Sequence, residues 1–210
     1  MTNERTPVTA ARRLTALSAV LVVAVLGLSA CDPKEAGSAA VVGGTRITET
    51  QLDANARDVT DRLHAAGADV PSTDQLLRAQ LEVLVDTTLV EEAARREGIT
   101  VTQGEVDELI QQAGGRSTVE KQLLTQQNLW LAPDHVDALA RSVLIQRALG
   151  ERLAPTGDST AQSDAVTKYM GQLSDELGVD ISPRYGVWDS SQLHIGTPPN
   201  DLSSPASATS

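Results

Sequence analysis

The fold is decided by residues 72–98, with the sequence STDQLLRAQLEVLVDTTLVEEAARREG. Apolar side chains recur in this stretch at helical spacing and define one face. They are Leu77, Leu81, Leu84, Val85, Leu89 and Ala93. Ser72 and Gln75 can form a capping box at the start, and Gly98 suits a left-handed C-cap after two arginines in the last turn. We expect one long helix here, and we expect it to be the spine of the domain.

Further helices are predicted on both sides of this spine. Ser or Thr followed three residues later by Gln or Glu can cap a helix start. Such pairs stand at Thr48/Gln51, Ser72/Gln75, Thr102/Glu105 and Ser117/Glu120. Apolar spacing then predicts helices over residues 48–67, 106–113, 117–127 and 133–150, and a last one from Val166 to Gly178. The predicted fold class is therefore mainly α.

Two short extended stretches complete the expected fold. Residues 39–42 precede the turn glycines Gly43 and Gly44, and residues 179–188 follow the last helix. If these stretches pair as strands, they bring the two ends of the domain together. The domain is then expected to cover residues 39–196.

Composition limits the classes of partner. Of the 17 basic and 28 acidic side chains, three basic and one acidic lie in residues 1–30, so the other 180 residues carry a net charge of −13. An acidic surface repels phosphate backbones, which argues against nucleic-acid binding and against anionic lipid headgroups. No phenylalanine is present, and only two tryptophans and two tyrosines. The core must therefore be built from Leu, Val, Ile and Ala.

A targeting signal is expected at the N-terminus. Two arginines precede an apolar run that ends in LSAC at residues 28–31, as in secretory signals with a small-residue cleavage site. This tetrad resembles the lipobox of bacterial lipoproteins. The resemblance implies cleavage between Ala30 and Cys31, lipid attachment to the Cys31 thiol, and anchoring at the extracytoplasmic face of the cell membrane. Residues 1–30 are then the signal peptide and residues 31–38 a tether.

A buried free cysteine and a transmembrane anchor are the alternatives for Cys31. The apolar run is shorter than the roughly 20 residues that span a bilayer, and it lacks charges that stop translocation. Cys31 is the only cysteine, so a lipidated chain has no thiol for a disulfide. At the other end, residues 197–210 are rich in Pro, Ser, Ala and Thr, and this composition predicts a disordered tail.

Residue types that support catalysis or metal binding are sparse. The three histidines, each without a second ligand at metal-site spacing, are His64, His135 and His194. The acidic pairs at 91–92 and 107–108 fit solvated helix faces better than an acid/base dyad. No glycine-rich phosphate loop and no nucleophile elbow are found. The sequence predicts no enzyme, no metal, no cofactor and no small-molecule ligand.

The strongest binding candidate is a run of three large apolar residues, Leu129, Trp130 and Leu131, before Pro133. Three consecutive side chains cannot all face one core on a regular helix, so one of them can be displayed to a partner. The alternative is a loop plug that seals the core, since tryptophan is usually mostly buried.

Three segments together resemble the N-terminal domain of the SurA and PrsA class of extracytoplasmic chaperone-foldases. They are AAVVGGTRIT at 39–48, the end of the long helix from Ser72 with the sequence AARREGITVT at 93–102, and ISPRYGVW at 181–188. The resemblance implies a helical module clamped by a small antiparallel pairing of its first and last strands. In that class a parvulin prolyl-isomerase domain lies between the last two helices. Here that place holds only residues 154–163, so the isomerase activity is not expected.

The resemblance implies a membrane-anchored, chaperone-like holdase for unfolded or newly exported polypeptides. Three other functions stay open. One is an adaptor or structural envelope lipoprotein that docks one folded partner, and another is the prolyl isomerase of the complete class. A solute-binding lipoprotein is the third, although such proteins need two α/β lobes that this chain is too short to form.

Overall fold

The structure is a computed structural model that describes residues 37–125 and 130–198. The predicted mainly α fold is confirmed within these residues, which form six α-helices, one 3-10 turn and two small sheets. The helical elements are α1 (Glu49–Ala66), α2 (Thr73–Glu97), α3 (Gln103–Gln112), α4 (Arg116–Thr125), η1 (Pro133–His135), α5 (Val136–Leu153) and α6 (Ser159–Leu177). The strands are β1 (Ser38–Val42), β2 (Thr45–Thr48), β3 (Val179–Ile181), β4 (Val187–Asp189) and β5 (His194–Gly196).

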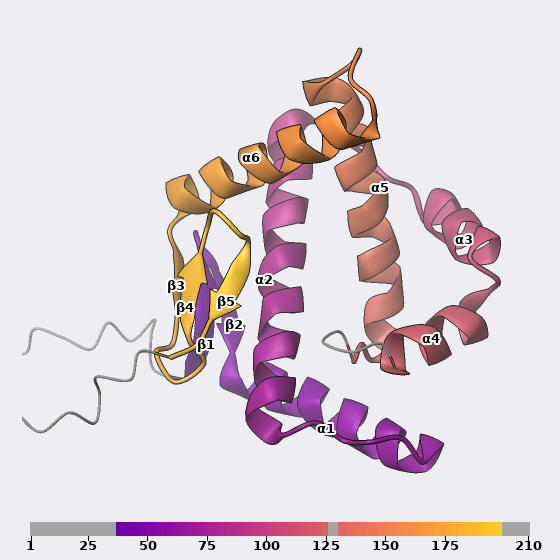
Figure 1. The fold of residues 1–210 in the computed structure, drawn as a ribbon, viewed down its shortest axis with the longest axis vertical. Helices are drawn as coiled ribbons and strands as arrows, with labels where there is room; N and C mark the ends of the chain where they lie inside the picture. Colours follow the sequence, from indigo (N-terminus) through magenta and orange to yellow (C-terminus); the bar gives the residue numbers. More distant parts are fainter. Residues whose placement is uncertain (1–36, 126–129, 199–210) are drawn as a thin grey trace, which may run out of the picture. The chain divides into compact units, whose positions relative to one another are not determined.

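Helix α2 is the spine that the sequence predicts. It contacts α1, α5, α6 and the sheet strands, and it stands between the sheets and α5 in Figure 1. Both halves of the Ser72/Gln75 capping box are present, and Gly98 ends the helix with a φ of 63°. Leu81, Val85 and Leu89 are fully buried on its inner face. The long amphipathic helix therefore organises the packing of the elements around it.

The two ends of the domain meet in one sheet, as predicted. Its strand order is β2-β1-β3, with both pairings antiparallel. In the β1–β3 pairing, Val42 lies opposite Val179 and Ala40 opposite Ile181. The first strand of the domain is therefore held between its hairpin partner and a strand that follows α6.

Residues 179–188 do not form the single closing strand that the sequence suggests. They contain β3 and β4, which belong to different sheets, because the chain turns between them at 182–186. Strand β4 pairs instead with β5, a strand that was not predicted from the sequence. Strand β2 was not predicted either, because its four residues, between a glycine turn and a helix cap, are too few to show the alternating apolar pattern of a strand.

Three predicted helix boundaries are wrong for identifiable reasons. The last helix does not begin at Val166, because Asp158 caps α6 by accepting a hydrogen bond from the Ala161 amide, so the helix already begins at Ser159. Gly150 does not end α5, which continues to Leu153. A Cβ at Gly150 would lie 3.1 Å from the Gln162 Cβ, so this glycine permits close packing of α5 against α6. Ser117 does not cap α4, because that helix already includes Arg116.

The buried side chains form a main core and a smaller cluster. The main core joins the sheets to the inner faces of α2, α5 and α6. The smaller cluster lies between α1 and the start of α2, and its buried members are Ala56, Val59, Leu63, Leu76 and Ala132. Half-buried apolar side chains border this smaller cluster, among them Val70 and Trp130.

Candidate functional site

The binding candidates at 129–131 have different environments. Leu129 lies outside the described residues, as do Ala30, Cys31 and the signal sequence. Leu131 is fully buried, so it offers no surface to a partner. For this residue, the alternative of a loop plug that seals the core fits the structure. Trp130 is half-buried against the smaller apolar cluster. Client binding by these residues stays a prediction, and of the two that the structure describes Trp130 is the one with exposed surface.

Trp130 is fixed through its backbone. Its φ of 41° lies in the left-handed region that non-glycine residues rarely adopt. The Gln80 side-chain amide, 1% exposed, donates a hydrogen bond of 3.0 Å to the Trp130 carbonyl. Gln80 was not predicted as a contact residue, although a glutamine between the apolar positions of a long helix is a signal for a buried polar contact. This contact ties the segment before η1 to the spine.

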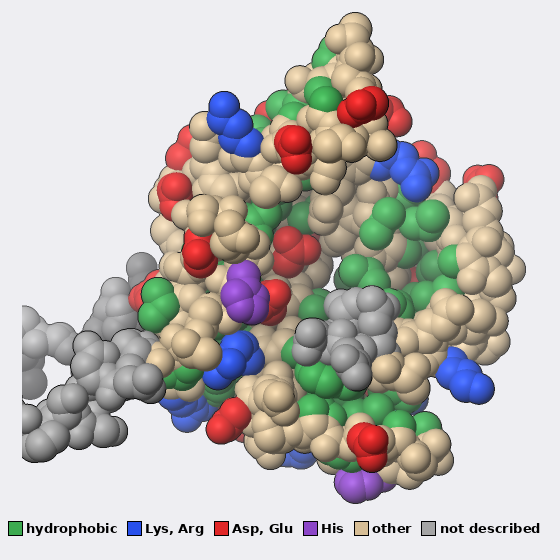
Figure 2. Space-filling view, in the orientation of Figure 1, with side chains coloured by type: hydrophobic (Ala, Val, Ile, Leu, Met, Phe, Trp, Pro, Cys, Tyr) green, Lys and Arg blue, Asp and Glu red, His purple; other side chains and the backbone are tan. Residues whose placement is uncertain are grey.

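Two shallow pockets flank Val70 and Pro71 in the α1–α2 connection. We call the first the Trp130 pocket; its volume is about 440 Å³ and its lining includes Leu63, Ala68, Asp69, Val70, Pro71, Gln75, Thr125 and Trp130. We call the second the Pro71 groove; its volume is about 350 Å³ and its lining is Asp53, Ala56, Arg57, Thr60, Asp61, Val70, Pro71, Thr73, Leu76 and Leu77. In Figure 2, apolar side chains gather in the part of the view where α1 and α4 lie in Figure 1.

Carboxylates outnumber arginines around these pockets. Arg57 lies 3.9 Å from Asp53, and Arg62 lies 2.8 Å from Asp58. The hydrogen bond from Arg62 to Asp58 raises the pKa of Arg62, and the charges of Asp134 and Glu120 add to this shift. The α1 end of the domain therefore carries an excess of negative charge beside exposed apolar surface.

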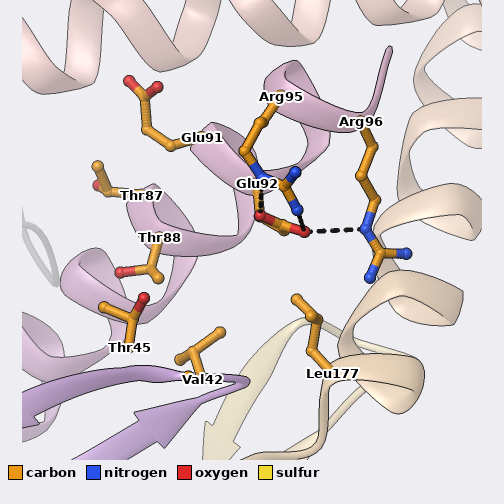
Figure 3. Close-up of a pocket in the computed structure, with 10 residues that line it drawn as sticks. Val42, Thr45, Thr87, Thr88, Glu91, Glu92, Arg95, Arg96 and Leu177 are labelled. Atoms are coloured by element: carbon orange, nitrogen blue, oxygen red, sulfur yellow. Dashed lines mark hydrogen bonds and ion pairs between the residues drawn. The ribbon is translucent and has the colours of Figure 1, made fainter. Parts of the chain in front are cut away.

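A pocket larger than these two lies elsewhere, at the C-terminal half of α2 (Figure 3). Its volume is about 880 Å³, and its lining is Val42, Gly44, Thr45, Thr87, Thr88, Glu91, Glu92, Arg95, Arg96 and Leu177. Figure 3 shows Glu92 between the two arginines, which both donate hydrogen bonds to its carboxylate. These bonds lower the pKa of Glu92 to about 2. The charged groups of this cavity therefore neutralise one another.

The same turn of α2 connects the spine to the helices that follow it. Glu91 accepts a hydrogen bond of 2.9 Å from Arg141 of α5, and Arg96 donates one of 2.6 Å to Glu176 of α6. Glu97 accepts one of 3.1 Å from the Tyr169 hydroxyl of α6. The Glu91/Glu92 pair is thus partly exposed, as predicted for a helix face, but Glu91 also links α2 to α5, while Glu92 bonds to arginines of its own helix.

No metal-binding arrangement is found among the described residues. They contain no group of three or more His, Cys, Asp or Glu side chains placed to hold an ion. His194 instead contacts the Glu82 carboxylate through Nδ1 at 2.8 Å, a link from β5 to α2. None of the helices within residues 37–125 and 130–198 is long and apolar enough to span a membrane.

Replacement of Asp86 by asparagine is expected to remove a pH-dependent loss of stability. Burial, with a smaller effect of the Glu82 charge, raises the pKa of Asp86 to about 6. The folded state then keeps a proton that the unfolded chain releases near pH 4, so stability falls as the pH rises from about 4 to 6. Two pKa units correspond to roughly 2–3 kcal/mol.

Urea unfolding at several pH values between 4.5 and 7 measures this effect. The Asp86→Asn protein should lose less stability than the wild type across this range. The exposed Asp164 of α6 provides the matched control, because Asp164→Asn makes the same chemical change away from Glu82. Parallel pH profiles for wild type and Asp86→Asn would contradict the assignment. Glu92 does not interfere, because its ion pairs are lost only at more acidic pH.

Comparison with protein families agrees with this architecture. The SurA-like N-terminal domain matches residues 5–129, more than half of the chain. The chain belongs to the SurA-like N-terminal domain family. The predicted resemblance is thereby confirmed, and the matched region includes β1, β2 and α1 to α4.

One curated relative illustrates the extent of the similarity. Over 118 residues, the chain is 33% identical to a protein named Chaperone SurA from Saccharophagus degradans. The alignment covers 56% of this chain and 27% of that protein, so the SurA-like domain corresponds to a minor part of the relative. No solved structure matches the chain. The similarity is to an N-terminal domain of chaperone type and not to a catalytic domain.

Proposed function

We propose that this protein is a membrane-anchored, extracytoplasmic lipoprotein that holds unfolded exported polypeptides and does not isomerise prolyl bonds. Membership of the SurA-like N-terminal domain family is the observation that carries the proposal. The relative's name, Chaperone SurA, supports a chaperone-like role at this coarse level. The two pockets beside Val70 and Pro71 supply concave, partly apolar surface that an unfolded chain can contact.

The connection between α5 and α6 supports binding without isomerisation. In the foldases that this chain resembles, the isomerase domain lies between the last two helices. Here α5 ends at Leu153 and α6 begins at Ser159, which leaves five residues, 154–158, at that place. Isomerisation requires a pocket that lowers a barrier of about 18–20 kcal/mol, which five residues cannot form.

A combined assay tests the proposal. The full-length protein is expected to suppress aggregation of an unfolded client at near-stoichiometric ratio and to leave the rate of proline cis/trans exchange at the buffer value. Trp130→Ser should weaken suppression severalfold while the far-ultraviolet circular dichroism spectrum stays that of the wild type. Val187→Ser is the matched control, since Val187 is a 54% exposed apolar residue on β4. Binding of a single folded partner without suppression would favour the adaptor function instead.

The lipid anchor has its own test. Cys31→Ser is expected to abolish incorporation of a labelled fatty acid and to release the protein from the membrane fraction, because lipid transfer requires the thiol. Each buried CH₂ of an acyl chain contributes about 0.8 kcal/mol to membrane attachment. Glu35→Gln, four residues away, should label like the wild type. Equal labelling of the Cys31→Ser and wild-type proteins would rule out the lipoprotein assignment.

A further inference from the structure

We infer that the Pro71 groove and the Trp130 pocket select client segments in which apolar side chains alternate with lysine or arginine. This inference rests on the proposed client binding and specifies the chemistry of the client. Three observations support it. The two pockets share an apolar wall, carboxylates lie at their rims, and the charges of the larger pocket at the C-terminal half of α2 are balanced.

The apolar wall comes from the α1–α2 connection. Val70 and Pro71 line both pockets, so the two concavities adjoin one another. The groove floor continues into the buried Ala56 and Leu76, while Leu77 and Val70 are half-buried. In an extended chain, residues i and i+2 point to the same side. Two adjacent pockets therefore suit an extended segment whose alternate side chains are apolar.

The rims carry more acid than the neighbouring arginines can pair. Asp53 and Asp61 line the groove, and Asp69 lines the Trp130 pocket. Arg57 forms an ion pair with Asp53, and Arg62 forms one with Asp58. Asp61 and Asp69 form no ion pair among those described. Both of these carboxylates are exposed. A bound segment can therefore place its own cations beside them.

Carboxylates of neighbouring elements add to the negative charge at the pocket rims. Asp134 of η1 and Glu120 of α4 act on Arg62 across the elements that meet at the end of α1. Because single exposed ion pairs contribute little, selection by charge needs several carboxylates around one surface. The α1 end satisfies this condition. Arg57 and Arg62 pair with Asp53 and Asp58, Arg184 also acts on Asp53, and Arg116 also acts on Glu120. Asp61 and Asp69 line the pockets without an ion pair among those described, and Asp134 adds its charge nearby.

The cavity on the other half of α2 offers no comparable selection. There Glu92 forms ion pairs with Arg95 and Arg96, and Glu91 forms one with Arg141. Charge complementarity therefore favours the α1 end over the larger cavity. It also favours a cationic apolar segment over a neutral or acidic one.

Peptide binding measured by fluorescence anisotropy tests the inference. Full-length protein in a neutral detergent is titrated into three labelled peptides of alternating Leu-Lys, Leu-Ser and Leu-Glu sequence. The Leu-Lys peptide should bind at least tenfold more tightly than the Leu-Glu peptide at low salt, and high salt should reduce this ratio. The double variant Asp61→Asn/Asp69→Asn should weaken Leu-Lys binding about three- to tenfold and leave Leu-Ser binding unchanged.

A charge-matched control locates the effect. Asp107→Asn/Glu108→Gln removes two exposed carboxylates from α3, so it changes the net charge equally away from the pockets. If this control weakens Leu-Lys binding as much, the overall charge selects the client and the site assignment fails. Equal affinity for the three peptides would overturn charge selection while leaving client binding intact. If none of the peptides binds, the proposed function itself fails.

Discussion

Removal of residues 179–210 is expected to abolish the cooperative unfolding transition, whereas removal of residues 197–210 should leave it close to that of the full chain. The longer deletion removes β3, β4 and β5. With them go three buried side chains of the main core, Ile181, Tyr185 and Ile195. Burial of one large apolar side chain stabilises by about 1.5–3 kcal/mol, so the three together approach the roughly 5–15 kcal/mol of a whole domain.

Specific contacts to the spine are lost in the same deletion. Arg78 donates a hydrogen bond of 3.0 Å to the Tyr185 carbonyl, and the Ile195 amide donates one of 3.3 Å to Glu82. Thermal melts followed by circular dichroism separate the two truncations. If the 179–210 deletion melts cooperatively near the wild-type temperature, the β1–β3 pairing does not hold the domain together. An unfolded 197–210 deletion would show that the tail has a structural role that its composition does not predict.

The long helices were predictable because local and tertiary signals coincide in them. The capping boxes at Ser72 and Thr102 form as their spacing suggests, and Gly67 and Gly98 end their helices with positive φ. Such signals act within one turn of a helix, so a single sequence contains them in full. The pairing of β1 with β3 could also be predicted from the sequence, because both stretches are apolar and border turn residues.

The features that sequence reasoning missed depend on contacts between distant residues. Gly150 resembles a helix stop, and only the approach of Gln162 shows that it is a packing position. In the sequence, Glu91 and Glu92 resemble a solvent-exposed pair. Only the structure shows that Arg141 of α5 bonds to Glu91 and that Glu176 of α6 bonds to Arg96 on the same part of α2. At the candidate site, the Trp130 pocket requires α1 and the α1–α2 connection to meet the chain at 130. A run of apolar residues alone cannot distinguish the buried Leu131 from its half-buried neighbour.

Gly186→Ala is expected to destabilise the protein by about 3 kcal/mol or more, through the β4–β5 hairpin. The φ of Gly186 is 139°, a region that L-residues with a side chain rarely adopt at a cost of about 1–3 kcal/mol. A Cβ at this position would lie 2.0 Å from the Gly196 carbonyl oxygen and 2.8 Å from the Ile195 Cγ2. Because Val187 pairs with Gly196 in the next step of the ladder, the backbone can relieve this overlap only by opening the hairpin.

Thermal unfolding measures the effect, since 1 kcal/mol shifts the Tm of a domain of this size by roughly 2–4 °C. A fall of about 6–12 °C is therefore expected for Gly186→Ala. Gly44→Ala is the matched control, because nothing lies within 4 Å of its added Cβ and its φ is not positive. Trp188 fluorescence adds a local readout, since the Trp188 indole donates a hydrogen bond of 3.2 Å to Ser174 of α6. A changed Trp188 emission with retained helicity indicates that the hairpin detaches first, while a Tm equal to that of Gly44→Ala would refute the close approach of Gly186 to Gly196.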